Sequence, residues 1–248
     1  MSPRRPGGRW ASLAQTTLPV ITLALATTTL YGALFYAPRE KVMGDVQRIF
    51  YFHAPAGLVC FLAFFVTFVA SIGYLATRRP GWDIAGRAST EAGLLLTTIV
   101  LVTGPLWARP VWGTYWTWEA RLTTTLVLWL IYMGYLLVRR YTEDPDQQAR
   151  FAAVVGIIGF IDVPIVYMSV HWWRGHHPQV LAVSGGGGLD PTMRQVFLMG
   201  IFTYLALYAS LMALRIPLGR AEAELRWLRL KLGERPARRA ASGLRASG

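Results

Sequence analysis

Six apolar segments, each close to twenty residues long, place the strongest constraint on what this chain can fold into. They cover residues 17–36, 55–76, 90–107, 122–138, 151–170 and 196–214. A helix of about 20 residues crosses the roughly 30 Å hydrocarbon core of a bilayer, and a helix satisfies its own backbone polar groups where lipid cannot. Only 15% of the residues are charged, whereas a soluble domain has about 25%. The sequence therefore predicts an all-α integral membrane protein, a bundle of six transmembrane helices.

The distribution of lysine and arginine predicts which side each loop faces. An even number of spans places both termini on one side. With the termini inside, the inner segments hold fourteen lysines and arginines near the span ends, against seven in the outer loops. Because basic loops stay in the cytoplasm, we expect cytoplasmic N- and C-termini. The chain then divides into a cytoplasmic N-terminus (1–16), a six-helix membrane domain (17–214) and a basic cytoplasmic tail (215–248).

The tail carries a helical pattern of its own. Apolar residues recur at steps of three and four between basic residues, at Leu218, Ala221, Leu225, Leu228 and Leu232. A cationic amphipathic helix of this kind binds either the anionic inner surface of the membrane or a partner subunit, and both interpretations stay open. After Gly233, the composition of Arg, Ala, Ser and Gly predicts disorder.

Cysteine usage and charge exclude two classes of protein. The single cysteine, Cys60, lies within an apolar segment, so the chain has no thiol pair for redox work and no CxxCH motif for covalent haem attachment. The net charge of +12 is spread over the segment ends and the tail, whereas a nucleic-acid binder gathers its charge on one face. We therefore expect neither a c-type cytochrome nor a nucleic-acid-binding protein.

With this topology, one face collects all the histidines and most of the tryptophans. His53 opens the second span, and His171, His176 and His177 follow the fifth. Six tryptophans lie at the same face, at positions 107, 112, 116, 118, 172 and 173. An aromatic belt at the membrane surface explains isolated tryptophans. It does not explain four aromatic residues within a stretch of seven residues in one loop. Such a cluster favours a platform for a flat apolar ligand.

Two kinds of ligand fit such a face. Two imidazoles on opposite sides of a planar macrocycle fill both axial positions of haem iron, and arginines suit the haem propionates. The candidate arginines are Arg48, Arg109, Arg121 and Arg174. A zinc site on His171, His176 and His177 is the competing interpretation. Asp162, beside Pro164 within the fifth span, is expected to shape the floor of the site.

Three motifs give the chain a resemblance to a known family. Residues 112–123 read WGTYWTWEARLT, residues 51–56 read YFHAPA, and residues 169–174 read SVHWWR with His177 following. The first resembles the tryptophan-rich WWD signature (W-G-x-W-W-x-W-D) of a haem-handling superfamily. The three motifs in this order resemble its cytochrome c maturation protein C (CcmC) branch, also called the haem exporter protein C family. The similarity extends from about residue 15 to residue 215.

The resemblance implies a protein of the bacterial inner membrane that works in c-type cytochrome biogenesis. Such a protein binds haem b transiently at its periplasmic face and delivers it to the haem chaperone CcmE. The implied partners are the ABC-type subunits CcmA and CcmB and the small protein CcmD. Carried over by position, His53 and His177 are the axial haem ligands, and Arg48 and Arg121 engage the propionates. The implied haem platform is the WWD loop at about residues 107–121, with Trp112, Tyr115, Trp116, Trp118 and Glu119.

Two positions depart from the family signature. Tyr115 stands where the signature has Trp, and Glu119 where it has Asp. Tyrosine keeps a flat ring, whereas glutamate moves the carboxylate outward by one methylene, so we expect the loop geometry to differ here. The chain needs no nucleophile or general base for this role, and we do not expect an enzyme.

Three alternative functions stay open. They are a haem or small-molecule exporter (permease) subunit of an ABC-type complex, an electron-transfer cytochrome b, and a zinc metalloenzyme. The spans hold few polar residues that could line a transport path. The histidine pairs that a cytochrome b carries inside its helices are missing from the sequence as well.

Overall fold

The computed structural model describes residues 8–142, 144–173, 175 and 189–245. Within these ranges, side chains are described from residue 12 to residue 232, except at residue 230. All regular structure in these residues is helical, and six helices are long and apolar enough to cross a membrane. The all-α, six-helix fold predicted from the sequence is confirmed. His176 and His177 lie outside the described residues, as does Arg174.

The six spans follow the predicted order and are longer than the apolar segments. The first span is α1 (Gly8–Tyr31) with a π-helical turn (Gly32–Tyr36), and the second is a 3₁₀ turn (Asp45–Ile49) followed by α2 (Phe50–Thr77). The third and fourth spans are α3 (Pro80–Trp112) and α4 (Ala120–Tyr141). The fifth consists of α5 (Pro145–Phe160) and α6 (Asp162–Trp172), and the sixth is α7 (Pro191–Arg245). The third span begins ten residues before its apolar segment, because Pro80 suits the first turn of a helix.

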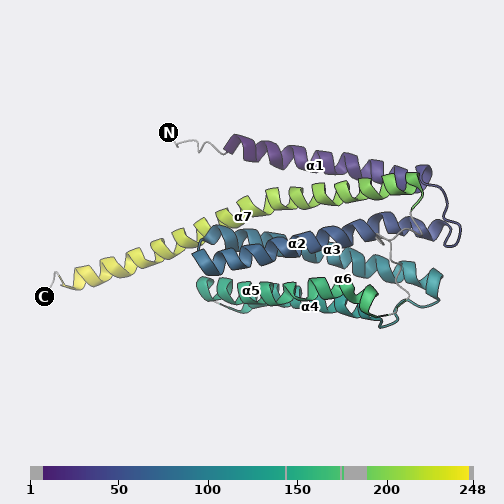
Figure 1. Ribbon diagram of the computed structural model, residues 1–248. Helices are drawn as coiled ribbons and strands as arrows, with labels where there is room; N and C mark the ends of the chain where they lie inside the picture. The colour runs from purple at the N-terminus through teal and green to yellow at the C-terminus, as the bar shows by residue number, and fades with distance from the viewer. Residues whose placement is uncertain (1–7, 143, 174, 176–188, 246–248) are drawn as a thin grey trace.

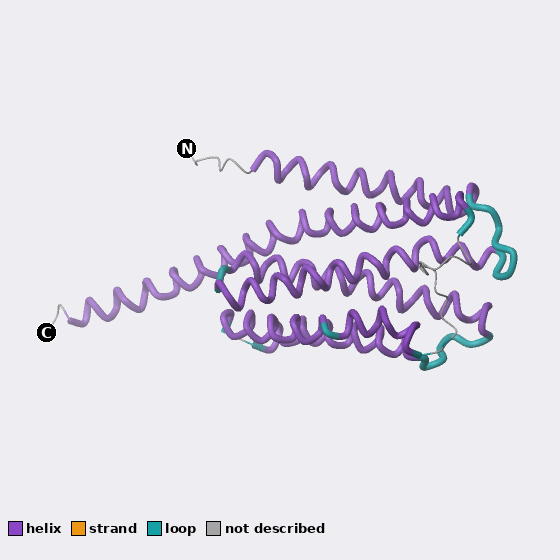
Figure 2. The backbone as a smooth tube through the Cα atoms, in the orientation of Figure 1, coloured by secondary structure: helices purple, strands orange, loops and turns teal. Residues whose placement is uncertain are grey.

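The helices form a bundle with α2 and α3 packed against each other at its centre. On one side α1 packs along α7, and on the other α4, α5 and α6 complete the bundle (Figures 1 and 2). The rings of Phe64 and Tyr132 stack within this core, with centroids 3.8 Å apart. Gly93 lies against this stack, and an added Cβ there would come 2.7 Å from the Phe64 ring. Glycine therefore sets how closely α3 approaches α2.

The fifth span is divided at Ile161, and the division opens a space in the bundle. Pro164 lacks the N–H that would bond to the carbonyl four residues earlier, and the turn at Ile161 tightens instead, with its N–H bonded to Ile158 at 3.1 Å. Before the break, α5 packs on α2 and α4; after it, α6 packs mainly on α4. α6 is therefore not packed closely on α2, and it lies toward the end of the bundle away from the termini (Figure 1).

Ion pairs tie the helices together at the end where the described chain begins and finishes. Arg139 of α4 makes a bidentate pair with Asp83 of α3, at 2.7 and 2.6 Å. Glu91 of α3 accepts from Arg215 of α7 at 2.5 Å and from Arg87, which also reaches Glu222 of α7 at 3.1 Å. These pairs involve the polar residues at the start of α3, which explains why this helix extends beyond its apolar segment.

Beyond the bundle, α7 continues into the basic tail as an uninterrupted helix (Figure 1). The leucines of the predicted amphipathic stripe are exposed along it, at Leu218, Leu225, Leu228 and Leu232. This exposure fits either of the two predicted uses of the stripe. The helix runs on to Arg245, past Gly233, after which the composition predicts disorder.

Candidate functional site

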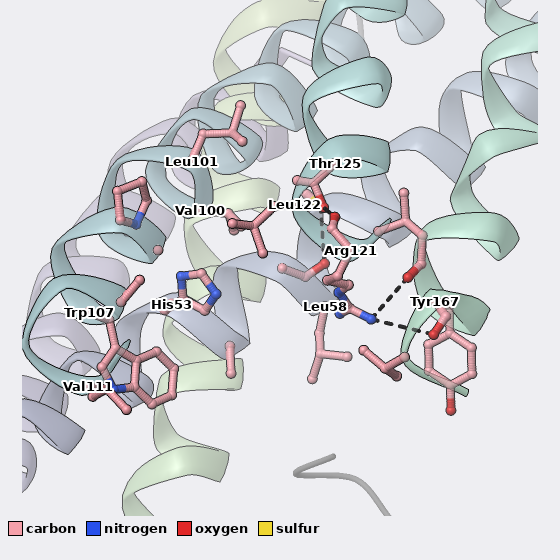
Figure 3. Close-up of a pocket in the computed structure, with 18 of the residues that line it drawn as sticks. His53, Leu58, Val100, Leu101, Trp107, Val111, Arg121, Leu122, Thr125 and Tyr167 are labelled. Atoms are coloured by element: carbon pink, nitrogen blue, oxygen red, sulfur yellow. Dashed lines mark hydrogen bonds between the residues drawn. The ribbon is translucent and has the colours of Figure 1, made fainter. Parts of the chain in front are cut away.

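A cavity of about 460 Å³ occupies the gap between α2, α3, α4 and α6 (Figure 3). Trp112 and Trp116 line it from the connection between α3 and α4. This connection lies at the end of the bundle opposite the termini (Figure 2), and we call this end of the cavity its mouth. The deeper walls are apolar and include Gly57, Val100 and Leu128. Its volume falls within the range of about 300–1,000 Å³ that is usual for small-molecule and cofactor sites.

His53 lies in the first turn of α2, is only 8% exposed, and lines the cavity. Its Nδ1 lies 2.9 Å from the hydroxyl oxygen of Thr103 on α3. That hydroxyl donates its single proton to the carbonyl of Ile99, at 2.6 Å. The hydroxyl oxygen must therefore accept from Nδ1–H, which places the lone pair of the neutral ring on Nε2. A metal-binding histidine is commonly fixed in this way through its other ring nitrogen.

Aromatic and small residues shape the wall around this imidazole. The rings of His53 and Trp107 meet edge to face, with centroids 5.7 Å apart at an interplanar angle of 74°. Gly104 leaves room beside them, since an added Cβ would stand 3.4 Å from Cε1 of His53. The buried indole N–H groups of Trp107 and Trp116, both at the cavity, have no hydrogen-bond acceptor within the part of the chain that the structure describes. They are donors available to a bound ligand.

The tryptophan-rich connection is shorter than the predicted 107–121 loop, because α3 continues through Trp112 and α4 begins at Ala120. Gly113 ends α3 with a left-handed φ of 76°, a conformation that favours glycine. Arg109 bonds to the carbonyl of Gly113, and its guanidinium lies 5.6 Å from the centre of the Tyr115 ring. Arg109 therefore fixes the loop and does not line the cavity.

Within this loop, only part of the predicted platform meets the cavity. Trp112 and Trp116 line it, whereas Tyr115 and Trp118 are 56% and 70% exposed and do not. Trp118 has a left-handed φ of 55°, and its ring packs edge to face on Trp116 with centroids 5.6 Å apart. The carboxylate of Glu119 lies against Gly175, where an added Cβ would stand 2.7 Å from Oε2. Glu119 therefore contacts the segment after α6.

The two predicted propionate-binding arginines have different environments. Arg121, in the first turn of α4, lines the cavity, and its Nη1 donates to the carbonyls of Val166 and Tyr167 on α6 at 3.0 and 3.4 Å (Figure 3). Arg48 does not line the cavity. Its Nε donates to Asp45 at 3.2 Å and its Nη1 to the carbonyl of Ala33, so it fixes the connection between the first two spans.

An acidic residue stands at the mouth. Glu40 lines the cavity from the segment before α2. The backbone N–H groups of Met43 and then Val42 donate to its carboxylate and hold the pKa of Glu40 below its usual value of 4.5. The mouth therefore carries a fixed negative charge on that side at neutral pH.

The structure thus brings His53, Trp112, Trp116 and Arg121 together at one cavity. Trp107 and His171, which the sequence placed at this face without a role in haem binding, also line the cavity. Thr103, which bonds to His53, was missed by sequence reasoning, although a threonine, glycine and proline in succession at 103–105 mark an irregularity in an apolar span. Asp162 does not form the floor. It is buried at the α5–α6 junction, and Oδ2 has no hydrogen-bond partner among the described residues.

The described residues contain no group of three or more histidine, cysteine or acidic side chains placed to hold a metal. Two histidines of the predicted zinc triad, His176 and His177, lie outside these residues, so the zinc interpretation stays a prediction. The axial role of His177 also lies outside them.

Comparison with known proteins identifies relatives over most of the chain. The family model described as Heme exporter protein C matches residues 6–229. Heme exporter protein C of Bradyrhizobium diazoefficiens is 37% identical over 208 residues, which cover 82% of this chain and 78% of that protein. Heme exporter protein C of Escherichia coli strain K12 is 31% identical over 199 residues, or 80% of each chain.

A plant protein is similar as well. The putative cytochrome c biosynthesis ccmC-like mitochondrial protein of Marchantia polymorpha is 33% identical over 162 residues, which cover 65% of this chain and 68% of that protein. All the residues that line the cavity, from α2, α3, α4, α6, α7 and the loops beside them, fall within the family match.

Proposed function

Because the chain belongs to the heme exporter protein C family, we propose that it handles haem in c-type cytochrome biogenesis, as a multi-pass membrane protein that holds haem in the cavity beside His53. The observation that carries this proposal is the cavity itself, in which a buried imidazole is fixed with its lone pair on Nε2. Haem iron is well suited to imidazole ligands.

The residues present fit a haem group. Apolar walls suit the macrocycle, Nε2 of His53 suits the iron, and the guanidinium of Arg121 suits a propionate. Nη1 of Arg121 makes both bonds to the carbonyls of α6, and a guanidinium has five N–H donors, so the side chain can hold α6 and a carboxylate together. Bound haem supplies the iron centre and the vinyl groups that are joined to a downstream acceptor.

The remaining roles follow the family pattern. His177 supplies the second axial nitrogen. Trp112 and Trp116 contact the macrocycle, while Tyr115, Trp118 and Glu119 hold the shape of the loop and its contact with the chain after α6. The ligand is haem b, bound transiently and passed to the chaperone CcmE, and the chain works with CcmA, CcmB and CcmD. It acts by binding and transfer, without a catalytic residue.

An absorption spectrum of the purified, haem-loaded protein tests this proposal. We expect a bis-imidazole spectrum that His53→Ala and His177→Ala each weaken and that the double variant abolishes. His176→Ala is the matched control, because it removes a neighbouring imidazole that the proposal does not use. A double variant that keeps the wild-type spectrum would contradict the proposal.

The proposal also places the mouth of the cavity on the periplasmic side of the inner membrane. The single cysteine, Cys60, is buried, so Cys60→Ser gives a background for labelling. In intact cells, a membrane-impermeant maleimide should label Tyr115→Cys, which lies in the tryptophan-rich loop, and should spare Trp227→Cys, which lies in the tail. The reverse pattern would contradict this orientation.

A further inference from the structure

The charged side chains around the cavity leave one carboxylate of a haem without an assigned partner. Haem carries two propionates, and Arg48, the second arginine that the family pattern suggests, is directed to Asp45 and Ala33. Among the described residues that line the cavity, Arg121 is the only arginine or lysine. Glu40 lines the mouth as an anion and disfavours carboxylates beside it.

Besides the indole N–H groups of the lining tryptophans, the cavity has a further ring N–H donor at His171. His171 lies in the last turn of α6, is exposed, and lines the same cavity as His53. Its ring contacts that of Tyr167, with centroids 5.9 Å apart and planes tilted by 34°. Since Tyr167 precedes it by four residues, the two side chains lie on one face of α6, about 6 Å apart along the helix axis.

Arg121 approaches this same part of α6. Its Nη1 donates to the carbonyls of Val166 and Tyr167, one turn before His171. The guanidinium and the imidazole therefore lie along the α6 side of the mouth. Glu40 belongs to the segment between α1 and α2, which Figure 1 shows on the far side of the bundle end from α6. One side of the mouth thus carries hydrogen-bond donors and the other carries negative charge.

We propose that His171 binds one propionate of the porphyrin by donating a ring N–H to it, while Arg121 binds the other, so that the α6 side of the mouth recognises a dicarboxylate. This inference rests on the proposed haem site and assigns to His171 a role other than iron ligation. An imidazole has an N–H in both its neutral and its charged form, so the interaction requires no particular protonation state. It would also hold the carboxylate edge of the macrocycle at α6.

Metal-free protoporphyrin IX tests this without any contribution from iron coordination. Its binding to the purified full-length protein is measured by fluorescence titration beside that of its dimethyl ester, which lacks both carboxylates. The ratio of the two affinities is compared between proteins in the same detergent, so that porphyrin partition into micelles cancels. The variants are His171→Phe, which keeps a flat ring without an N–H, and His171→Gln, which keeps a donor.

We expect the wild-type protein to prefer the free acid and His171→Phe to reduce that preference about fivefold, the size expected for one charge-assisted bond weakened by exposure. His171→Gln should restore most of the preference, and neither variant should change the affinity for the ester. An unchanged preference in His171→Phe would overturn the inference alone, whereas a wild-type protein that binds neither porphyrin would overturn the proposed haem cavity with it.

Discussion

The hydrogen bond between His53 and Thr103 gives the sharpest test of the proposed role of this imidazole as an iron ligand. Thr103→Val keeps the shape of the side chain and removes the hydroxyl that accepts from Nδ1–H. The donor is then left buried without an acceptor, which costs about 1–3 kcal/mol. It regains a partner only if the ring turns or changes tautomer, and either change moves the lone pair from its position on Nε2.

The expected loss of haem affinity follows from these energies. A penalty of about 1–3 kcal/mol corresponds to roughly a 5- to 150-fold weaker binding constant, and loss of the hydrogen bond behind a metal-bound histidine typically costs about 10- to 100-fold. We therefore expect Thr103→Val to weaken haem binding by about tenfold or more, measured by titrating haem into the purified protein and following the Soret band.

Two variants control this experiment. Thr103→Ser keeps the hydroxyl and should bind haem nearly as well as the wild-type protein. Thr97→Val removes another buried hydroxyl of α3, which donates to the backbone carbonyl of Gly93 in the same helix. This variant should leave haem binding unchanged. If Thr103→Val is folded and binds haem with wild-type affinity, the tautomer argument is wrong.

Three further predictions follow from individual contacts. Trp116→Ala should weaken haem retention by severalfold more than Trp118→Ala, because only Trp116 lines the cavity; equal losses in haem retention by gel filtration would contradict this. Arg139→Gln should destabilise the bundle by about 3 kcal/mol, because it leaves a partly buried Asp83 without its bidentate partner; thermal unfolding in detergent measures the loss, and an unchanged midpoint would refute it. Glu40 has a lowered pKa, so its stabilisation of the mouth is present above its unfolded pKa of about 4.5 and is lost as pH falls through the lower folded value. Glu40→Gln should abolish this pH dependence, measured as amide exchange in the segment before α2. The same pH profile in the wild-type protein and in Glu40→Gln would contradict this prediction.

The number, order and type of the spans could be predicted from the sequence because they depend on local composition. A run of about twenty apolar residues is sufficient to predict a membrane helix. The start of α3 could not be predicted from hydropathy, since Asp83 and Arg87 sit inside this helix through ion pairs with Arg139 of α4 and Glu222 of α7. Those partners are distant in the sequence.

The residues that line the cavity could be predicted in part, for a similar reason. His53, Trp116 and Arg121 belong to contiguous motifs that can be recognised in the sequence. The position of Arg48 depends on a carbonyl from the first span, and the use of Thr103 depends on how α2 packs against α3. Such choices are set by tertiary packing, which a pattern within one segment does not contain.

Coordination of haem iron by Nε2 of His53 is the central claim, and imidazole rescue tests it most directly. His53→Gly removes the ligand and leaves a space the size of its ring beside Trp107. The bis-imidazole absorption and magnetic circular dichroism of the haem-loaded protein should be lost in this variant and should return when free imidazole is added. A His53→Gly protein that keeps the wild-type spectrum without added imidazole would contradict the account.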